Sequence, residues 1–262
     1  MPILQFRRSP VLVAMTILTA LAVLGTSGCA VWRIKQSVDL ARQSEPFQAS
    51  PSGAIAVLLV VGDSTAVGTG ASSPASSLAG LIARDHPQLK IVNRARDGAR
   101  FADIARQLET AGSERFDVIL ILGGGNDVIR FTGDEVLAYE TERAVALAHS
   151  RAGVVVIMPS GNVGSAPFFY PPWSWLMTAR SKALHGMVCE AASSHGALFV
   201  NLFKDRADDP FARRPDEFNA IDGLHPSDAG YQLWYDELKI QADFLRRLTA
   251  LRSQTIQMVQ GL

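Results

Sequence analysis

One serine and one histidine, far apart in the sequence, have the neighbours that a nucleophile and its base need. Ser64 follows an apolar run in the sequence Gly62-Asp63-Ser64. His225 stands three residues after Asp222, in a segment that contains Gly223 and Pro226 and is therefore expected to turn. A carboxylate that accepts a hydrogen bond from Nδ1 of an imidazole leaves Nε2 free to take a proton from a hydroxyl. These residue types can perform nucleophilic attack if the fold brings them together.

Each of these motifs also has a purely structural explanation. Ser and Asp at the turn between a strand and a helix cap free backbone N–H groups, so Gly62-Asp63-Ser64 alone is equally typical of a helix start. Pro226, followed by Ser227 and Asp228, is typical of the first turn of a helix. That explanation accounts for the residues after His225, but it gives no reason for Asp222 ahead of it.

Two glycine-containing segments offer hydrogen-bond donors for a developing negative charge. In residues 121–128, three glycines precede Asn126, whose amide can donate to an oxyanion. In residues 93–101, Gly98 can offer its backbone N–H. Both segments are also typical of glycine-rich turns. A phosphate-binding loop is not favoured, because no Gly-Lys-Ser/Thr follows.

The elements that must position these residues alternate along the chain. Short β-branched apolar runs alternate with helix-like segments from residue 54 onward, which is typical of a parallel sheet covered on both faces in one α/β domain. Ligands bind beyond the carboxyl ends of such strands, where Ser64, Asn126 and the loop 159–173 fall. The expected strands are 54–61, 89–93, 116–122, 153–159 and 197–203, and the expected helices lie near 75–85, 101–112, 134–150, 174–195 and 227–250.

Taken in order, the motifs resemble the SGNH (GDSL) hydrolase superfamily over about residues 54–250. Gly-Asp-Ser follows the first strand, a glycine follows the second, Gly-x-Asn-Asp follows the third, and Asp-x-x-His precedes the last helix. Each motif is weak alone, but four in this order are specific. The resemblance implies a three-layer α/β/α sandwich with a flavodoxin-like, five-stranded parallel sheet.

The resemblance also implies a role for each matching residue. Ser64 would be the nucleophile, His225 its base and Asp222 the acid that orients the base. The oxyanion hole would be formed by the backbone N–H groups of Ser64 and Gly98 and by the side-chain amide of Asn126. Neither a metal nor an organic cofactor is implied. Asp63 and Asp127, beside these residues, are interpreted as structural residues of their loops.

The expected activity is ester hydrolysis through an acyl-enzyme. The leading hypothesis is an esterase or lipase-like acyl hydrolase acting on a small-molecule or lipid ester, with thioesters and lysophospholipids included. An O-acetyl esterase acting on cell-envelope polysaccharide is an alternative with the same chemistry, and a catalytically silent binding module is an alternative from another class. A conventional α/β-hydrolase is not favoured. It would have Gly-x-Ser-x-Gly after several strands, whereas residues 62–66 read Gly-Asp-Ser-Thr-Ala after the first.

Two features outside the motifs are candidates for substrate binding. Arg96 and Arg100 flank Gly98, where they either lie on the surface or bind an anionic group of the substrate. The loop 159–173 is long, and long loops in compact domains are often functional. Its aromatic residues are expected to line an acyl pocket, contact a membrane surface, stack on a sugar or cover a small apolar cluster. They are Phe168, Phe169, Tyr170 and Trp173, with Trp175 close by.

Composition excludes some classes of partner and site. The 25 Lys and Arg residues balance 25 Asp and Glu residues, so the charge of the chain does not indicate a nucleic-acid partner. The two cysteines, Cys29 and Cys189, cannot build a disulfide framework, and their spacing to histidines is not that of a zinc site.

The N-terminus predicts export. Arg7 and Arg8 precede a stretch without charges that continues to Arg33, as in a secretory signal. Thr-Ser-Gly-Cys, ending at Cys29, resembles a bacterial lipoprotein signal with a lipidated cysteine; an uncleaved membrane anchor is the alternative. We therefore expect a protein tethered on the periplasmic or cell-envelope side, or a secreted one if the signal is simply cleaved. The expected divisions are 1–28 signal or anchor, 29–53 linker, 54–252 hydrolase domain and 253–262 C-terminal tail.

Overall fold

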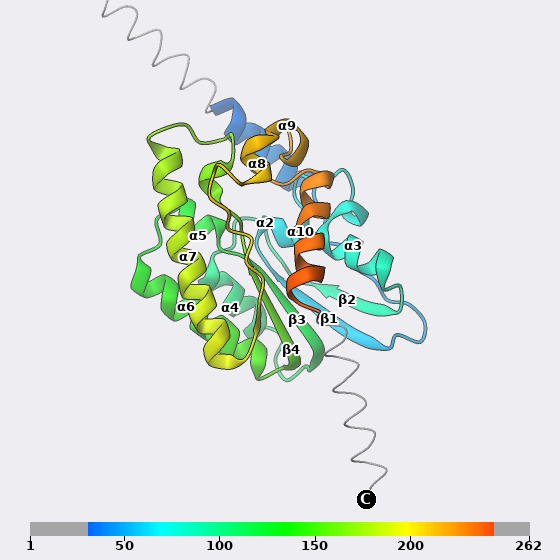
Figure 1. Cartoon of the computed structure of the whole chain (residues 1–262). Coiled ribbons are helices and arrows are strands. Elements are labelled where there is room, and N and C mark those ends of the chain that lie inside the picture. The colour runs from blue at the N-terminus through cyan, green and yellow to red at the C-terminus, as the bar shows by residue number, and fades with distance from the viewer. Residues whose placement is uncertain (1–30, 244–262) are drawn as a thin grey trace, which may run out of the picture.

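A parallel sheet forms the centre of the computed structural model, which describes residues 31–243 (Figure 1). Its five strands lie in the order β2-β1-β3-β4-β5, and every neighbouring pair is parallel. The strands are β1 (Ala56–Gly62), β2 (Leu89–Asn93), β3 (Phe116–Gly123), β4 (Ala152–Pro159) and β5 (Leu198–Phe199).

The central strands are apolar on both faces because each face packs against helices. Leu58 and Val60 of β1 point into one apolar core, and Leu59 and Val61 point into the other. Successive side chains of a strand alternate between its two faces, so a strand buried on both sides reads as a continuous apolar run. This is the pattern that the sequence shows.

Helices cover both faces of this sheet, which confirms the expected three-layer α/β/α sandwich (Figure 1). The long helices are α3 (Leu78–Asp85) and α10 (Asp228–Gln241) on one face, and α4 (Phe101–Glu109), α6 (Asp134–His149) and α7 (Trp173–His195) on the other. The short ones are α2 (Ser64–Val67), α5 (Gly125–Ile129), α8 (Pro210–Arg213) and α9 (Pro215–Phe218), with 3-10 turns at Pro74–Ser76 and Val163–Ser165.

The fifth strand is shorter than the sequence predicts. Val200 still donates its N–H to the carbonyl of Ile157 at 2.9 Å. The next N–H, of Asn201, instead donates to Oε1 of Gln241 on α10 at 2.8 Å. The chain therefore leaves the sheet after β5, and residues 201–209 become a loop near the carboxyl ends of the strands.

The segment before β1 was interpreted as a linker, but much of it packs on the domain. Residues 31–43 form a helix, called here the N-terminal helix, at the end of the molecule where α8 and α9 lie (Figure 1). Farther on, Gln48 exchanges two hydrogen bonds with the backbone of Asn93. Within residues 31–43 no fully buried apolar stripe marks the helix, since Leu40 is only partly buried and the other large apolar residues are exposed: Val31, Trp32, Ile34 and Val38.

The expectations for residues 1–28, for Cys29 and for the tail 253–262 lie outside the described residues and stay predictions. Between residues 31 and 243, the structure contains no helix that is both long enough and apolar enough to span a bilayer.

The end of β1 tolerates only glycine at position 62. An added Cβ would lie 1.9 Å from the carbonyl oxygen of Leu122 on β3. Gln107 also clamps this residue, because its side chain accepts from the Gly62 N–H at 2.8 Å and donates to the Gly62 carbonyl at 2.9 Å. We expect Gly62→Ala to lower the free energy of unfolding by about 3 kcal/mol or more, because two strands must separate locally.

Urea unfolding of the full chain measures this effect. Gly186→Ala on α7 is the matched control, since nothing lies within 4 Å of the Cβ it adds. Because alanine favours a helix more than glycine does, this variant should be more stable than the wild-type protein by up to about 1 kcal/mol. Equal stability of the two variants would contradict the proposed close contact at Gly62.

Candidate active site

Ser64, His225 and Asp222 form one continuous hydrogen-bonded chain, although 161 positions separate the serine from the histidine. Nε2 of His225 lies 2.9 Å from Oγ of Ser64, and Nδ1 lies 2.6 Å from Oδ2 of Asp222. Ser64 and His225 are each 8% exposed, and Asp222 is fully buried. The fold thus brings together the three residues that the sequence singled out.

The turn after β1 gives Ser64 its position. Asp63 is the N-cap of α2, and its Oδ1 accepts hydrogen bonds from the N–H of Thr65 at 2.9 Å and from Oγ1 of Thr65 at 2.7 Å. Ser64 is the first residue of the helix, so capping does not occupy its hydroxyl, which faces His225. The motif is therefore a helix start that leaves the Ser64 hydroxyl free to contact His225.

The turn before α10 folds Asp222 back onto the imidazole. Oδ1 of Asp222 accepts from the backbone N–H groups of Leu224 at 3.0 Å and His225 at 3.1 Å, which leaves Oδ2 facing Nδ1. Burial acts to raise the pKa of Asp222, but hydrogen bonds from His225, Ser37 and Leu224 outweigh it and hold this pKa at about 2. The carboxylate is thus ionised at neutral pH, and it favours the tautomer that leaves Nε2 as the acceptor.

Three candidate hydrogen-bond donors belong to residues that line the pocket at Ser64. Gly98, at φ +74°, and Asn126, in the first turn of α5, both line the same pocket as Ser64. Among the described residues, none accepts a hydrogen bond from the backbone N–H of Ser64 or Gly98 or from the side-chain amide of Asn126. These donors remain available to a ligand oxygen, which is the arrangement that an oxyanion hole requires.

Asp127 ties together the loops that carry Gly98 and Asn126. Its Oδ2 accepts from the N–H of Phe101, the first residue of α4, at 3.0 Å. The side chain is 2% exposed, and burial raises its pKa. This geometry agrees with the interpretation of Asp127 as a structural residue.

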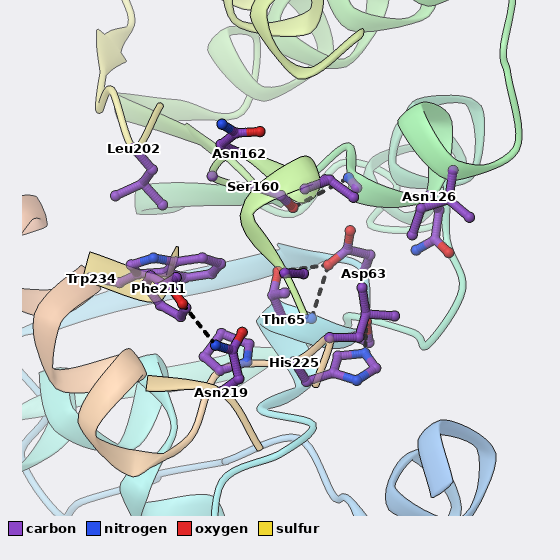
Figure 2. A pocket seen from close by; sticks show the side chains of 18 of the residues that line it. Asp63, Thr65, Asn126, Ser160, Asn162, Leu202, Phe211, Asn219, His225 and Trp234 are labelled. Carbon is purple, nitrogen blue, oxygen red and sulfur yellow. Dashed lines mark hydrogen bonds between the residues drawn. The ribbon is translucent and has the colours of Figure 1, made fainter. Parts of the chain in front are cut away.

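A pocket extends from these residues toward α10 (Figure 2). It encloses a cavity of about 290 Å³. In Figure 2, Asn126, Asp63 and His225 lie at one side of the cavity, and Phe211 and Trp234 lie at the other. The apolar residues of the lining toward α10 are Leu202, Phe211, Leu233 and Trp234, and the polar ones of the same region include Lys204, Asp209, Asn219 and Glu237.

The residues that the sequence suggested for substrate binding lie elsewhere. The described residues that line the pocket do not include Arg96 or Arg100, which are both exposed. Arg130, which the sequence analysis missed, does line it, with a guanidinium nitrogen 3.1 Å from where a Cβ on Gly98 would stand. Arg130 follows the Gly-x-Asn-Asp motif by a few residues. This short distance in the sequence is the feature that could have indicated a place for Arg130 near the pocket.

The aromatic residues of the loop 159–173 are also absent from the described pocket lining. Phe168 and Phe169 pack edge to face with ring centroids 5.0 Å apart, and Phe169 packs against an apolar core. Tyr170 and Trp173 are 64% and 58% exposed. The N–H of Phe168 donates to the carbonyl of Gly223 at 2.9 Å, so the loop contacts the turn that follows Asp222. The geometry therefore does not place these rings in an acyl pocket.

Residues 31–243 contain no cluster of three or more His, Cys, Asp or Glu side chains that could hold a metal ion.

The buried carboxyl of Asp63 should make stability depend on pH. Burial raises its pKa from 3.8 to about 6, against the lowering effect of the Thr65 hydrogen bonds. The folded protein then holds this proton more tightly than the unfolded chain does. The free energy of unfolding should fall as pH rises from about 4 to about 6, by up to about 3 kcal/mol from this group.

We expect Asp63→Asn to abolish this fall in the free energy of unfolding. The amide keeps an oxygen that can accept from the Thr65 N–H, and it has no charge to bury. The variant and the wild-type protein should have similar stability at pH 4, and the variant should be more stable at pH 8. Urea unfolding at both pH values checks this. A stability difference that is the same at the two pH values would contradict it.

Comparison with known proteins agrees with this geometry. The model of the GDSL-like Lipase/Acylhydrolase family matches residues 60–233. The crystal structure of TesA has a similar fold, with a TM-score of 0.58 and 19% identity over 73% of this chain and 99% of that chain. LAE5, an alpha/beta hydrolase enzyme from the metagenome of Lake Arreo, Spain, matches with a TM-score of 0.56 and 20% identity over 71% of this chain and 94% of its own.

Axe2, an acetylxylan esterase from Geobacillus stearothermophilus, matches with a TM-score of 0.52 and 20% identity over 75% of this chain and 95% of its own. None of the curated proteins matches this chain in sequence. At these identities the solved structures show a shared fold. The family match runs from β1 into α10, and so the chain belongs to the GDSL-like lipase/acylhydrolase family of SGNH hydrolases and is an ester-hydrolysing enzyme.

Proposed function

We propose that this enzyme cleaves acyl esters with Ser64 as nucleophile, His225 as general base and Asp222 as the acid that orients the base. The observation that carries the proposal is the hydrogen-bonded chain from Oγ of Ser64, through the imidazole, to Oδ2 of Asp222. Both links are within the 2.6–3.2 Å range in which a nucleophile and its base can exchange a proton.

The reaction follows from the positions of these atoms. Nε2 of His225 takes the proton of Ser64 while Oγ bonds to the acyl carbon. The carbonyl oxygen gains negative charge and accepts hydrogen bonds from the donors of Ser64, Gly98 and Asn126. The imidazolium, stabilised by Asp222, then protonates the leaving alkoxide or thiolate. Water, deprotonated by Nε2, attacks the acyl-enzyme, releases the acid and restores Ser64.

The proposed substrate carries an acyl group longer than acetyl. A cavity of about 290 Å³ opens beside Ser64, near the lower end of the roughly 300–1,000 Å³ range of small-molecule pockets. Its wall toward α10 includes Leu202, Phe211, Leu233 and Trp234, whose side chains offer apolar surface to a hydrocarbon chain. An acetyl group would leave that wall without a partner. The O-acetyl esterase alternative rests on the reaction chemistry alone and has no such support from the pocket.

Replacing the proposed nucleophile tests the reaction. We expect Ser64→Ala to reduce kcat on a p-nitrophenyl ester by about 10⁴-fold or more, because it removes the hydroxyl that contacts Nε2 of His225. A fluorophosphonate probe should label the wild-type protein and fail to label the variant.

Ser193→Ala is the matched control, since the Ser193 hydroxyl only donates to the Cys189 carbonyl on an exposed part of α7. It should keep full turnover and labelling. Turnover or labelling that survives Ser64→Ala would rule out the proposed mechanism. A wild-type protein that neither turns over esters nor reacts with the probe would be a binding module.

Filling the pocket tests the proposed substrate. With one leaving group held constant, kcat/KM of the wild-type protein should rise from acetyl to medium-chain acyl esters. Leu202→Phe adds volume beside Trp234 and should lower kcat/KM for the longer esters by about 10-fold or more. Acetyl ester turnover by the same variant is the internal control and should change little. A wild-type preference for acetyl esters, on free esters or acetylated glycans, would instead support the O-acetyl esterase.

A further inference from the structure

The N-terminal helix lies outside the part of the chain that the family model matches, yet it contacts the site itself. Oγ of Ser37 donates a hydrogen bond to Oδ2 of Asp222 at 2.5 Å. The same oxygen accepts from Nδ1 of His225 at 2.6 Å. Ser37, with Val38 and Ala41 on the same helix, also lines the pocket. A segment that precedes β1 therefore contributes both a polar contact and part of the pocket wall.

Arg33 fixes this helix over the turn that carries Asp222. Its guanidinium donates to the carbonyl of Pro167 and, at 3.1 Å, to the hydroxyl of Tyr170. It also lies 5.3 Å from the centre of the Tyr170 ring, a distance typical of a cation–π contact. The loop with Pro167 and Tyr170 is in turn hydrogen-bonded to Gly223, the residue after Asp222. Helix, loop and turn thus support one another.

The Ser37 contact matters because the Asp222 carboxylate is fully buried. A buried charge is stable only when hydrogen-bond donors replace the water it has lost. Oδ1 receives two backbone N–H groups, of Leu224 and His225, which hold that oxygen within the turn. Oδ2 receives Nδ1 of His225 and the hydroxyl of Ser37. Without Ser37, one side of the oxygen that faces His225 would have no donor.

We propose that Ser37 is a positioning residue for the proposed Ser64–His225–Asp222 triad. Its hydroxyl holds the Asp222 carboxylate in the orientation that receives Nδ1 of His225, and the N-terminal helix is an integral wall of the active site. The inference rests on the proposed function, since it assigns Ser37 a role in the same reaction. Ser37 acts through Asp222 and does not touch the reacting atoms.

Three variants of the full chain test this inference, with kcat and KM measured on one medium-chain p-nitrophenyl ester. Ser37→Ala removes the donor and should lower kcat by about 10-fold, with KM changed less than about twofold. Ser37→Thr keeps a hydroxyl and should recover most of the lost kcat. Ser44→Ala is the control, because the Ser44 hydroxyl donates to the Leu40 carbonyl just beyond the same helix. It should match the wild-type protein.

Wild-type kcat in Ser37→Ala, or an equal loss in Ser37→Thr, would overturn the inference. The unfolding midpoint shows whether Ser37→Ala folds. If it does not, Ser37→Thr tests the inference, which then requires that this variant folds and retains the kcat of the wild-type protein. A double variant adds a further criterion. When Asp222→Ala is already present, Ser37→Ala should cause no additional loss of kcat if it acts through that carboxylate.

The Ser64→Ala result separates the two proposals. An active Ser64→Ala protein would refute the proposed mechanism whatever Ser37 does. An inactive Ser64→Ala protein together with an unaffected Ser37→Ala protein would refute only the role of Ser37.

Discussion

A single buried carboxylate sets the conditions that the rest of this site must satisfy. Asp222 has no exposed surface and remains charged, which is costly unless every side of the carboxylate has a hydrogen-bond donor. Donors come from its own turn, from the imidazole of His225 and from Ser37 on the N-terminal helix. The donors therefore come from segments that lie far apart in the sequence. The turn before α10 is also hydrogen-bonded to the loop at residues 167–170, through the N–H of Phe168 and the carbonyl of Gly223.

The loops after the strands are held by other buried polar groups, each with its own partner. Gln107 clamps the last residue of β1, Asp63 caps α2, and Asp127 joins the loops that follow β2 and β3. In each contact a buried side chain accepts a hydrogen bond from a backbone N–H, which holds the loops that carry Ser64, Gly98 and Asn126. Donors that are already fixed need little rearrangement when negative charge develops, which is the physical advantage of a preorganised site.

The site combines this rigid polar edge with an apolar pocket. The cavity lies between the carboxyl ends of the strands and the segment from α8 to α10, where Phe211 and Trp234 form its far side. The chain leaves the sheet after β5, where Asn201 pairs with Gln241, and Leu202 in the loop that follows lines the cavity. The long aromatic loop, in contrast, supports the turn of Asp222 from outside. Tyr170 contributes through Arg33 rather than through the pocket.

The sequence by itself determined the layered fold and the residues of the hydrogen-bonded chain. Both depend on local information: apolar runs of strand length, glycine at tight turns, and residue types such as Asp222 and His225 placed three positions apart. Such patterns can be recognised in a short stretch of sequence, because residues that are neighbours in the sequence belong to the same strand or turn.

Only the tertiary structure decided the pocket wall and the place of Ser37. Ser37 and Asp222 are 185 positions apart, and the exposed apolar residues of the N-terminal helix hide its packing from any periodicity argument. Arg96 and Arg130 illustrate the same limit. Both arginines lie within a few residues of a proposed oxyanion-hole residue, but only the path of the chain after each strand decides which one reaches the pocket.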